Sequence, residues 1–390
     1  MRAAFPFPRA SGLDLEPEYL VRQRFAPVSR VEFPYGEPAW LVTRYADVRT
    51  VLTDPRFSRA ASLERDVPRV TKENFSGGIV AMDPPEHTRL RSICRHAFTP
   101  RTVARLRERA TAIATELISE TGEEFDGVEE FALPFTLKMI CELLGVPYDQ
   151  RASFREWAEA GLATTSITEE ERLAATGKMW DFVVELVAQR RERPRNDLIS
   201  AMLAAQTCDV TDDELVIVVM TVLVAGYETT STQLPNFLYL LLTDRTRFQA
   251  LTDDPSLIPS AVEELMRYVP LEANGTTPRY AVEDVVLSGI RIEAGSPVVP
   301  ASAAANRDPD VFADPDRLDF ARAPNPHLGF GVGAHFCLGA PLARLELRVA
   351  LEVLTSIAPG LRLARGEAGI DWKTGMLVRG PSRLALTERT

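Results

Sequence analysis

The sequence predicts a mainly α fold with small β-sheets, and three observations support this. Most of the chain after Pro85 places its apolar residues at helical spacing. Strand-like runs are confined to a region near each end. One stretch, Leu215–Ala225, is apolar on every side, which is typical of a fully buried central helix. We therefore expect a helical body built around one long helix.

The N-terminal region predicts a β-hairpin followed by a helix. Val28–Phe33 alternates between the two faces of a strand, a turn follows at 34–38, and Trp40–Thr43 is a second short apolar run. Two such runs joined by a turn rich in proline and glycine indicate a hairpin. Tyr45–Leu52 then has helical spacing.

The rest of the chain predicts mostly helices. Thr99 and Pro100 form an N-cap with proline at the first helical position. Further helical patterns cover Leu133–Leu144, Glu169–Arg190, Leu198–Ala205, Asp212–Leu242, Ser260–Tyr268 and Ala340–Ile357. Pro278–Pro300 is rich in strand formers, with a hairpin at Val285–Ile292. Pro235, inside the longest helix, favours a kink or an end there.

Composition narrows the class of protein. The 390 residues include no Ser/Gly-rich linker and no repeat, so we expect a single domain over 1–390. The net charge of −11 argues against a nucleic-acid partner. The first residues contain prolines and no apolar run, so we expect neither a signal peptide nor a membrane anchor. Four scattered cysteines suit a reduced, cytoplasmic protein.

The most informative segment is the loop 329–339, which reads Gly-Phe-Gly-Val-Gly-Ala-His-Phe-Cys-Leu-Gly. A lone thiolate, here Cys337, approached by backbone amides can hold a haem iron from one side. Glycines at 331, 333 and 339 allow tight turns and a close approach to a flat cofactor. The helix that follows stabilises a thiolate charge. The alternative is a buried structural cysteine in a turn.

The pattern Phe330-Gly-x-Gly-x-His335-x-Cys337-x-Gly339 resembles the haem-binding loop of the cytochromes P-450. The resemblance extends from about Pro27 to about Pro381. It implies the cytochrome P-450 fold with the long central helix over the haem, and haem b with Cys337 as its axial ligand. By the same resemblance, Phe330, Gly331 and Gly339 belong to the cofactor site.

The predicted central helix is interrupted by Ala225-Gly226-Tyr227-Glu228-Thr229-Thr230. Glycine inside a helix costs about 1 kcal/mol relative to alanine, and a buried carboxylate costs several kcal/mol unless it is partnered. Threonine can bond back to the preceding turn and bend the helix. From these residues alone, a helix kink with a solvated acid remains the alternative. The hexapeptide resembles the oxygen-activation signature of the family.

That resemblance implies specific roles. Thr229 would hydrogen-bond dioxygen, and Glu228 would relay protons from solvent. Ala225 and Gly226 would leave room for dioxygen and substrate.

Glu264 and Arg267 lie at i and i+3 on one predicted helix face. Alone, the spacing predicts only a surface ion pair. The pair resembles the ExxR motif of the family, in which a second arginine completes a buried triad. The match to that arginine is Arg317, in Asp314-Pro-Asp-Arg317-Leu. The triad would hold the core behind the cysteine loop and would take no part in the chemistry.

Haem propionates need cations or hydrogen-bond donors. The resemblance assigns this role to His87, Arg91, Arg279 and His335, with arginine suited by its bidentate fork. Each of them alone is more simply read as a surface residue. His96 and His327 match no motif, and we interpret them as structural.

The resemblance also implies where substrates and partners bind. Substrate-facing segments would be Ser58–Ile79, Leu162–Glu171, Val224–Thr229, Leu271–Thr277 and Met376–Val378. No flavin or nicotinamide domain is recognisable, so electrons would come from a ferredoxin and its reductase. We predict a basic patch for that partner at Arg95, Arg101, Arg105, Arg344 and Arg348.

The interpretation of function is a haem-thiolate monooxygenase that hydroxylates or epoxidises a bulky natural product of the macrolide or polyketide kind. Several stretches, such as Ala39-Trp-Leu-Val-Thr-Arg-Tyr, resemble actinobacterial antibiotic-tailoring enzymes. We expect a monomer that binds neither membrane nor nucleic acid. One alternative is oxidative C–C or C–N coupling or ring formation on a peptide or aromatic natural product. A more distant alternative is a non-catalytic haem-binding protein.

Overall fold

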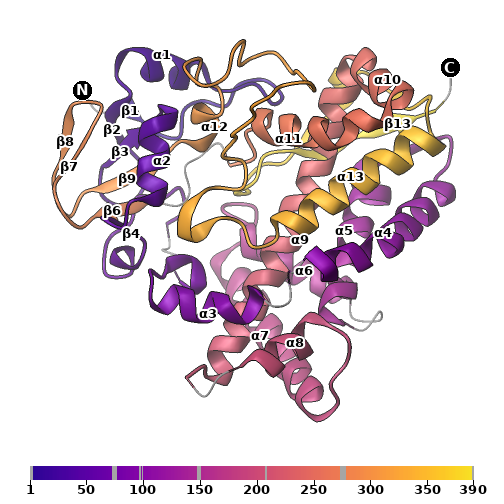
Figure 1. Ribbon diagram of the computed structural model, residues 1–390, viewed down its shortest axis with the longest axis horizontal. Coiled ribbons are helices and arrows are strands. Elements are labelled where there is room, and N and C mark those ends of the chain that lie inside the picture. The colour runs from indigo at the N-terminus through magenta and orange to yellow at the C-terminus, as the bar shows by residue number, and fades with distance from the viewer. Residues whose placement is uncertain are drawn as a thin grey trace. The chain divides into compact units, whose positions relative to one another are not determined.

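The computed structural model describes residues 3–72, 77–95, 98, 100–146, 151–206, 209–272 and 278–388 (Figure 1). Its contacts group the chain into two compact units, each built from two segments. The first unit comprises Met1–Arg89 and Glu263–Cys337. The second comprises Leu90–Val262 and Leu338–Thr390. The expected single domain over 1–390 stays a prediction.

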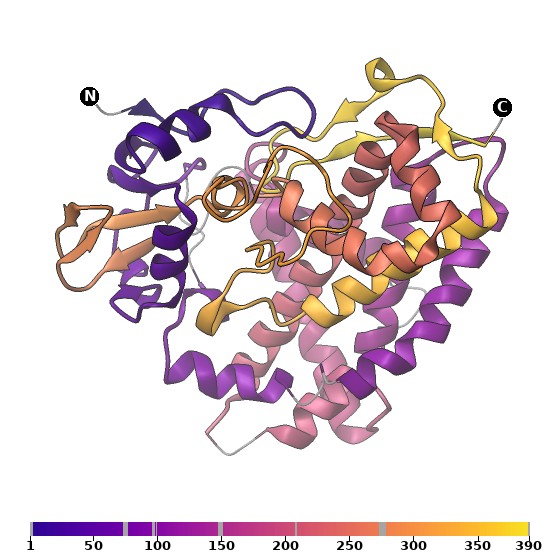
Figure 2. The same cartoon turned by 45° about the horizontal axis from the view of Figure 1, so that its top comes forward.

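The first unit contains a six-stranded mixed sheet with the order β1-β2-β3-β9-β6-β4. Its strands are β1 (Ala3–Ala4), β2 (Val28–Glu32), β3 (Ala39–Val42), β4 (Phe57–Ser58), β6 (Arg279–Ala281) and β9 (Pro297–Pro300). The predicted hairpin is confirmed, because β2 and β3 pair antiparallel with Ser29 opposite Leu41. The next neighbour, β9, pairs parallel to β3 although it comes from far along the chain. In Figure 2 the orange strands β6 and β9 lie beside the indigo N-terminal elements.

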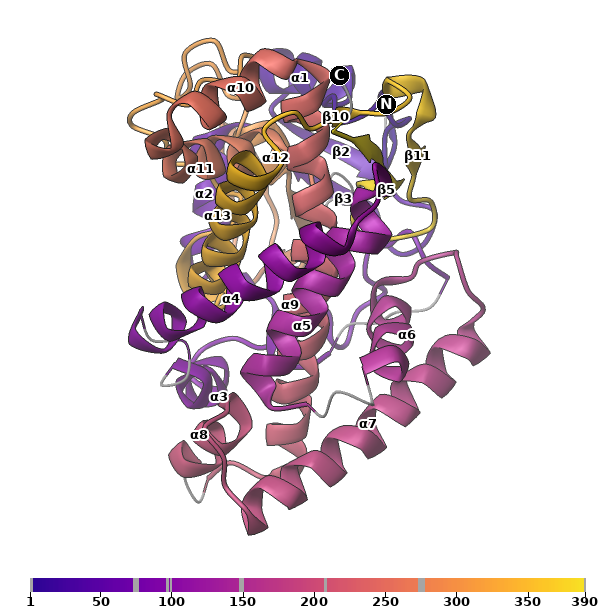
Figure 3. The ribbon, with the colours of Figure 1, turned by 90° about the vertical axis from the view of Figure 1, so that its right-hand side faces the viewer.

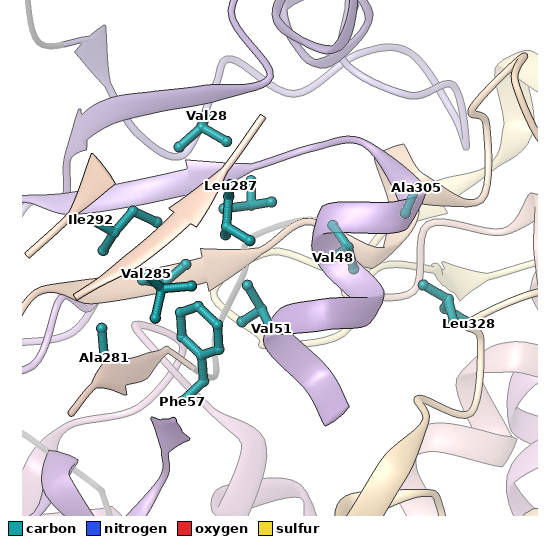
Figure 4. Packing of buried hydrophobic residues seen from close by; sticks show 12 residues of the cluster. Val28, Val48, Val51, Phe57, Ala281, Val285, Leu287, Ile292, Ala305 and Leu328 are labelled. Atoms are coloured by element: carbon teal, nitrogen blue, oxygen red, sulfur yellow. The ribbon is translucent and has the colours of Figure 1, made fainter. Parts of the chain in front are cut away.

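The helices α1 (Pro17–Phe25), α2 (Tyr45–Thr53) and α12 (Ser302–Ala305) lie beside this sheet. The first unit also includes most of α11 (Ile258–Tyr268). A separate hairpin, β7 (Val285–Leu287) and β8 (Ile290–Ile292), confirms the second predicted hairpin. Figure 4 shows Val51 of α2, Phe57 of β4 and Val285 of β7 packed in one apolar cluster. Each such buried side chain stabilises the fold by about 1.5–3 kcal/mol.

The second unit is mainly helical. Its helices are α4 (Pro100–Glu120), α5 (Leu133–Leu144), α6 (Arg151–Leu162), α7 (Glu169–Glu192), α8 (Leu198–Ala205), α9 (Asp212–Thr243), α10 (Arg245–Asp253) and α13 (Ala340–Ile357). The helix α3 (Glu86–Arg95) begins in the first unit and continues into the second. Two small sheets complete it: β5 (Glu124–Asp126) with β10 (Arg362–Leu363) and β13 (Ala385–Thr387), and β11 (Asp371–Trp372) with β12 (Pro381–Arg383).

The long helix α9 is the centre of this unit, because α5, α6, α7, α10 and α13 all pack against it. Figure 3 shows α5 alongside α9, and α6 beside α7. The helix begins with a capping box, in which Thr211 and Glu214 each satisfy a backbone N–H of the other. Its length and apolar composition would also suit a membrane span, but 56% of its most apolar window is buried within the protein. Its packing is that of a core helix.

One expectation for α9 needs correction. The stretch Leu215–Ala225 is not buried on every side, because Ile217 and Thr221 are half-buried and Ala225 is exposed. The predicted helix Asp212–Leu242 is confirmed to within one residue, since α9 continues through Pro235 to Thr243 and does not end at the proline. Residues 230–238 are all buried. We infer that this packing outweighs the roughly 3 kcal/mol that a proline costs inside a helix.

The other predicted helices are confirmed, most of them to within two residues. The bounds of α5, α8 and α13 agree with those expected, whereas α7 is two residues longer. The helix α4 begins at Pro100 as expected, but its predicted cap, Thr99, lies outside the described residues.

Candidate active site

The cysteine loop belongs to the first unit and is shaped by two glycines. Gly331 and Gly333 have φ of 67° and 80°, a region in which residues with a side chain are strained. The backbone N–H of Cys337 donates to the carbonyl of Phe330 over 2.9 Å, which closes the loop. The Cys337 side chain is exposed. Gly339, the N-cap of α13, also lies in a turn as predicted, but its φ of −80° is open to any residue.

Close backbone contacts hold this loop in place. A Cβ at Gly333 would lie 2.7 Å from the carbonyl oxygen of Leu52, in α2. A Cβ at Gly329 would lie 2.6 Å from the carbonyl oxygen of Met266, in α11. Neither position therefore has room for a side chain, and the loop is fixed against two helices of its own unit.

Basic side chains gather beside the loop around Asp83. The rings of His87 and His335 lie 4.2 Å apart between centroids. Arg279, at the start of β6, is 7% exposed and donates to the carbonyl of Phe57 over 3.5 Å. Arg59, which sequence reasoning placed only in a substrate loop, belongs to the same cluster, and its backbone N–H donates to Asp83 over 2.9 Å.

The cluster gathers basic side chains around few acidic ones. Burial, helped by His87, Arg279 and Arg59, lowers the pKa of His335 to about 3. Burial and Arg279 likewise lower the pKa of Arg59 to about 10, against the opposing effects of Glu272 and Asp83. Burial alone would raise the pKa of Asp83, but hydrogen bonds from Ser58 and from two backbone amides lower it. The two arginines and two histidines thus offer hydrogen-bond donors that can bind a further anion.

The predicted ExxR pair is buried within the same unit. Glu264 and Arg267 form a two-point ion pair over 2.7 and 2.8 Å. Arg267 also donates to the carbonyls of Asn306, Pro315 and Arg317. The network therefore ties α11 to the long segment that leads to the cysteine loop.

The predicted third member of this triad is wrong. Arg317 has a side chain that is 67% exposed and pairs with Asp319. The third member is Arg322, whose Nε lies 3.1 Å from both carboxylate oxygens of Glu264. The reason is local geometry: Arg317 turns its backbone carbonyl toward Arg267 and Arg322, and its side chain outward.

In the second unit, α9 presents a partly accessible stripe at four-residue spacing: Ile217, Thr221, Ala225 and Thr229. The Thr229 hydroxyl donates to the carbonyl of Ala225 over 2.6 Å, which is the back-bond expected. The two residues predicted to face dioxygen therefore share one accessible helix face.

Gly226 lies on a different face of α9. A Cβ there would approach within 2.8 Å of Cδ1 of Ile140, in α5. The absence of a side chain thus lets α5 and α9 pack closely. The role predicted for Gly226 at dioxygen stays a prediction, beside this packing role.

Glu228 is fully buried, so the solvated acid considered from sequence is wrong. Its Oε1 accepts from Nζ of Lys373 over 2.5 Å and from Oγ1 of Thr232 over 3.3 Å. Its Oε2 is buried without a hydrogen-bond partner among the described residues. Burial raises the pKa of Glu228 despite the opposing ammonium of Lys373. Such a carboxyl can exist in both protonation states, which suits proton transfer.

Three of the five predicted substrate-facing segments meet in the second unit. The amides of Thr164 and Thr165 both donate to the carbonyl of Gly375, and Leu377 donates back to Leu162. Val224 of α9 lies against Gly161 at the end of α6. The other two segments, Ser58–Ile79 and Leu271–Thr277, belong mostly to the first unit, and residues 73–76 and 273–277 lie outside the described residues.

The predicted site residues thus fall into two groups. The first unit holds His87, Arg279, Phe330, Gly331, His335 and Cys337, and the second holds Arg91, Ala225, Gly226, Glu228, Thr229 and Gly339. Sequence reasoning missed Lys373 and Arg322, and it did not place Arg59 in the basic cluster. The only signal for Lys373 is rarity, because four of the 44 Lys and Arg residues are lysines.

Comparison with known proteins identifies the class. A profile of the cytochrome P-450 family matches residues 168–355. The chain is 50% identical over 386 residues to "Mycinamicin IV hydroxylase/epoxidase" of Micromonospora griseorubida, covering 98% of this chain and 97% of the relative. It is 45% identical over 390 residues to "Nocardicin C N-oxygenase" of Nocardia uniformis subsp. tsuyamanensis, covering 98% of both.

A solved structure agrees. A variant of the mixed-function P-450 MycG in complex with mycinamicin IV superposes with a TM-score of 0.94 at 48% identity, covering 99% of this chain and 100% of the other. The fold and the cysteine loop are therefore those of a haem-thiolate enzyme. The chain belongs to the cytochrome P-450 family and is a cytochrome P-450 monooxygenase. Membership implies a haem-thiolate cofactor.

The residues present fit that cofactor. Cys337 offers an exposed thiol in a closed loop. The basic cluster beside it offers arginine and histidine donors, and Nε2 of His335 is buried without a hydrogen-bond partner among the described residues. The carboxylates of a haem would accept hydrogen bonds from these donors.

Proposed function

We propose that Cys337 is the axial ligand of haem b and that His87, Arg91, Arg279 and His335 bind its propionates. The observation that carries this proposal is the basic cluster, in which two arginines and two histidines gather around Asp83, with Glu272 beside Arg59. When bound, the haem supplies activation of dioxygen with two electrons from a separate donor. Arg59 extends the same cluster and would add a further donor.

The second group of residues would handle protons. Thr229 holds its hydroxyl on the accessible face of α9, where it can exchange its bond to Ala225 for one to dioxygen. Burial raises the pKa of Glu228 against the opposing ammonium of Lys373, which would ease its protonation. The presence of both residues favours oxygen activation over peroxide-driven chemistry.

For the substrate, we infer a bulky natural product of the macrolide or polyketide kind. The names of the relatives support this class, and three predicted substrate-facing segments converge in the second unit. The reaction would be hydroxylation or epoxidation. The N-oxygenase relative shows that the oxidised atom varies within this group. A coupled or cyclised product would instead support the coupling alternative.

Electrons would come from a ferredoxin and its reductase in the cytoplasm, with the protein acting as a monomer. Of the predicted patch, the described side chains are exposed Arg105 on α4 and half-buried Arg344 and Arg348 on α13. The helices α4 and α13 pack together, so the three arginines share one helix pair. The side chains of Arg95 and Arg101 lie outside the described residues. Reversing the charge of Arg344 and Arg348 should slow reduction by ferredoxin at low salt, and an unchanged rate would refute the patch.

The central test is the Cys337→Ser variant. It should lose the red-shifted Soret band of the reduced carbon monoxide complex, whereas the buried Cys94→Ser variant should keep it. A thiolate spectrum retained in Cys337→Ser would overturn the assignment. Screening macrolides, peptides and terpenoids for low-spin to high-spin optical shifts, followed by product analysis, tests the substrate class.

A further inference from the structure

The C-terminal segment 371–383, which we name the strap, lies along α9. Within it, the N–H of Lys373 donates to the carbonyl of Gly380 over 2.9 Å, next to the pairing of β11 with β12. A Cβ at Gly380 would lie 2.5 Å from Cγ2 of Thr232, so the strap touches the helix closely there.

The contacts of the strap follow one stripe of the helix. Lys373 binds Glu228 and Thr232, and Asn236 donates to the carbonyl of Arg379 over 2.9 Å. The rings of Tyr239 and Trp372 meet edge to face at 5.2 Å. The helix residues are spaced by four, four and three positions, which places them on one face. The fold thus fixes the strap at three successive turns of α9.

This docking brings a lysine to an otherwise buried acid. The Lys373 side chain is 13% exposed, whereas that of Glu228 is 0% exposed. Nζ of Lys373 also donates to Oγ1 of Thr232 over 2.9 Å. A single ammonium therefore holds Oε1 of Glu228, while Oε2 accepts no hydrogen bond from the described residues.

An arginine, the far commoner basic residue in this chain, has a fork that can bind both carboxylate oxygens. Arg267 binds Glu264 in that way. A lysine is a point charge and occupies one oxygen only. The choice of lysine at 373 is thus consistent with leaving the second oxygen of Glu228 available to a proton.

We propose that Lys373 is a positioning residue for proton delivery, which holds Glu228 through Oε1 so that Oε2 alone takes up and releases the proton. The inference rests on the proposed role of Glu228. In the step, the O–H bond at Oε2 breaks, its electron pair stays on the carboxylate, and the proton passes to the Thr229 hydroxyl, which would hand its own proton on. A hydronium ion from solvent then returns a proton to Oε2 and leaves as water. Catalysis by Glu228 then depends on a residue 145 positions away in the sequence.

Other charged groups act on Glu228 as well. Glu159, in α6, raises its pKa, and Arg155 of the same helix binds Glu159 over 2.8 Å. Tyr227, the preceding residue on α9, interacts with Glu228, Glu159 and Arg155. Among the groups identified as acting on Glu228, Lys373 is the only cation. Its removal should therefore have the largest effect on the protonation of Glu228.

The test is infrared titration of the haem-loaded protein without substrate. The carbonyl stretch of protonated Glu228 is assigned by its loss in Glu228→Gln. In Lys373→Met, the midpoint of this band should rise by about one to three pH units. Lys373→Arg keeps a cation that can bind both oxygens, so its midpoint should lie at or below the wild-type value. Thr232→Val should move the midpoint by less than about one unit, because its bond to Glu228 is neutral. An unchanged midpoint in Lys373→Met would overturn the proposal.

A second readout is the share of electrons that ends in oxidised product rather than in peroxide. Lys373→Met should send several-fold more electrons to peroxide, while haem content and substrate-induced spin shift stay as in the wild type. If the midpoint moves but the ratio of product to peroxide stays the same, Lys373 does not act on proton delivery. The proposal then fails, although the monooxygenase assignment stands. If Cys337→Ser keeps the thiolate spectrum, the proposed function fails, whatever the infrared result.

Discussion

Glu264 in the first unit and Glu228 in the second are both buried, at 1% and 0% exposure, yet their partners differ. Both oxygens of Glu264 accept hydrogen bonds, from Arg267, Arg322, Asn325 and the amide of Asp319. Glu228 has one occupied oxygen and one without a partner among the described residues. A fully bonded acid rigidifies a core, whereas a half-bonded one keeps capacity for a proton. The contrast separates a structural acid from a functional one.

The largest effect on stability is expected for Glu264→Gln. The change leaves Arg267 and Arg322 buried without a counter-charge, so the free energy of unfolding should fall by about 3–5 kcal/mol. Denaturant unfolding of the haem-loaded protein measures it. A loss below about 1 kcal/mol would show that the network does not support the core.

Glu228→Gln should affect turnover far more than stability. Stability near neutral pH should change by only about 1 kcal/mol, whereas turnover should fall by about a hundredfold because the proton carrier is lost. Turnover with the same substrate and donor measures the second effect. Wild-type turnover in the variant would remove Glu228 from the mechanism.

The pH dependence of stability gives a second test of Glu228→Gln. Because the folded pKa of Glu228 is raised, the folded state holds a proton that the unfolded state has already released. Wild-type stability from this group is thus present at acidic pH and lost as pH rises through the folded pKa. The variant should lack that loss, so parallel stability curves would contradict the raised pKa.

A matched pair of variants sharpens the assignment of the first network. Arg322→Ala should cost about 2 kcal/mol, since a nearly buried, charge-assisted bond to Glu264 is lost. Arg317→Ala should change stability by less than about 0.5 kcal/mol, because its side chain is mostly exposed. Thermal unfolding of both variants compares them. Equal losses would contradict the distinction.

Thr229→Ala should lower product formation by less than Glu228→Gln lowers turnover. The variant should bind substrate as the wild type does but divert electrons to peroxide, with product per electron falling by about tenfold, or 1.4 kcal/mol. Peroxide and product are measured together. Tightly coupled product formation would show that the hydroxyl takes no part in oxygen activation.

The sequence predicted most of the elements and many of the site residues, and the reasons are local. Helical spacing identified α5, α8 and α13 to the residue, because amphipathic periodicity depends only on neighbours along the chain. The glycines at 331 and 333 predicted tight turns, and their positive φ confirms this prediction. The motif around Cys337 was recognisable because its residues are contiguous.

The same reasoning failed where a partner is chosen across space. Arg317 and Arg322 lie in one loop with the same chemistry, and only the path of the backbone decides which side chain turns inward. The sequence left open whether α9 kinks or ends at Pro235, and only the folded structure shows that it does not end there. Full burial of Leu215–Ala225 was inferred from composition, which cannot tell which face stays accessible.

Local sequence specifies α5, α8 and α13, the cysteine loop, and the acid and threonine of the long helix, because these depend on residues adjacent in the chain. Folding determines that Glu228 is buried and bonded to Lys373, and that Arg322 completes the Glu264 network. Burial and charge pairing belong to residues that folding brings together, here across 145 and 58 positions.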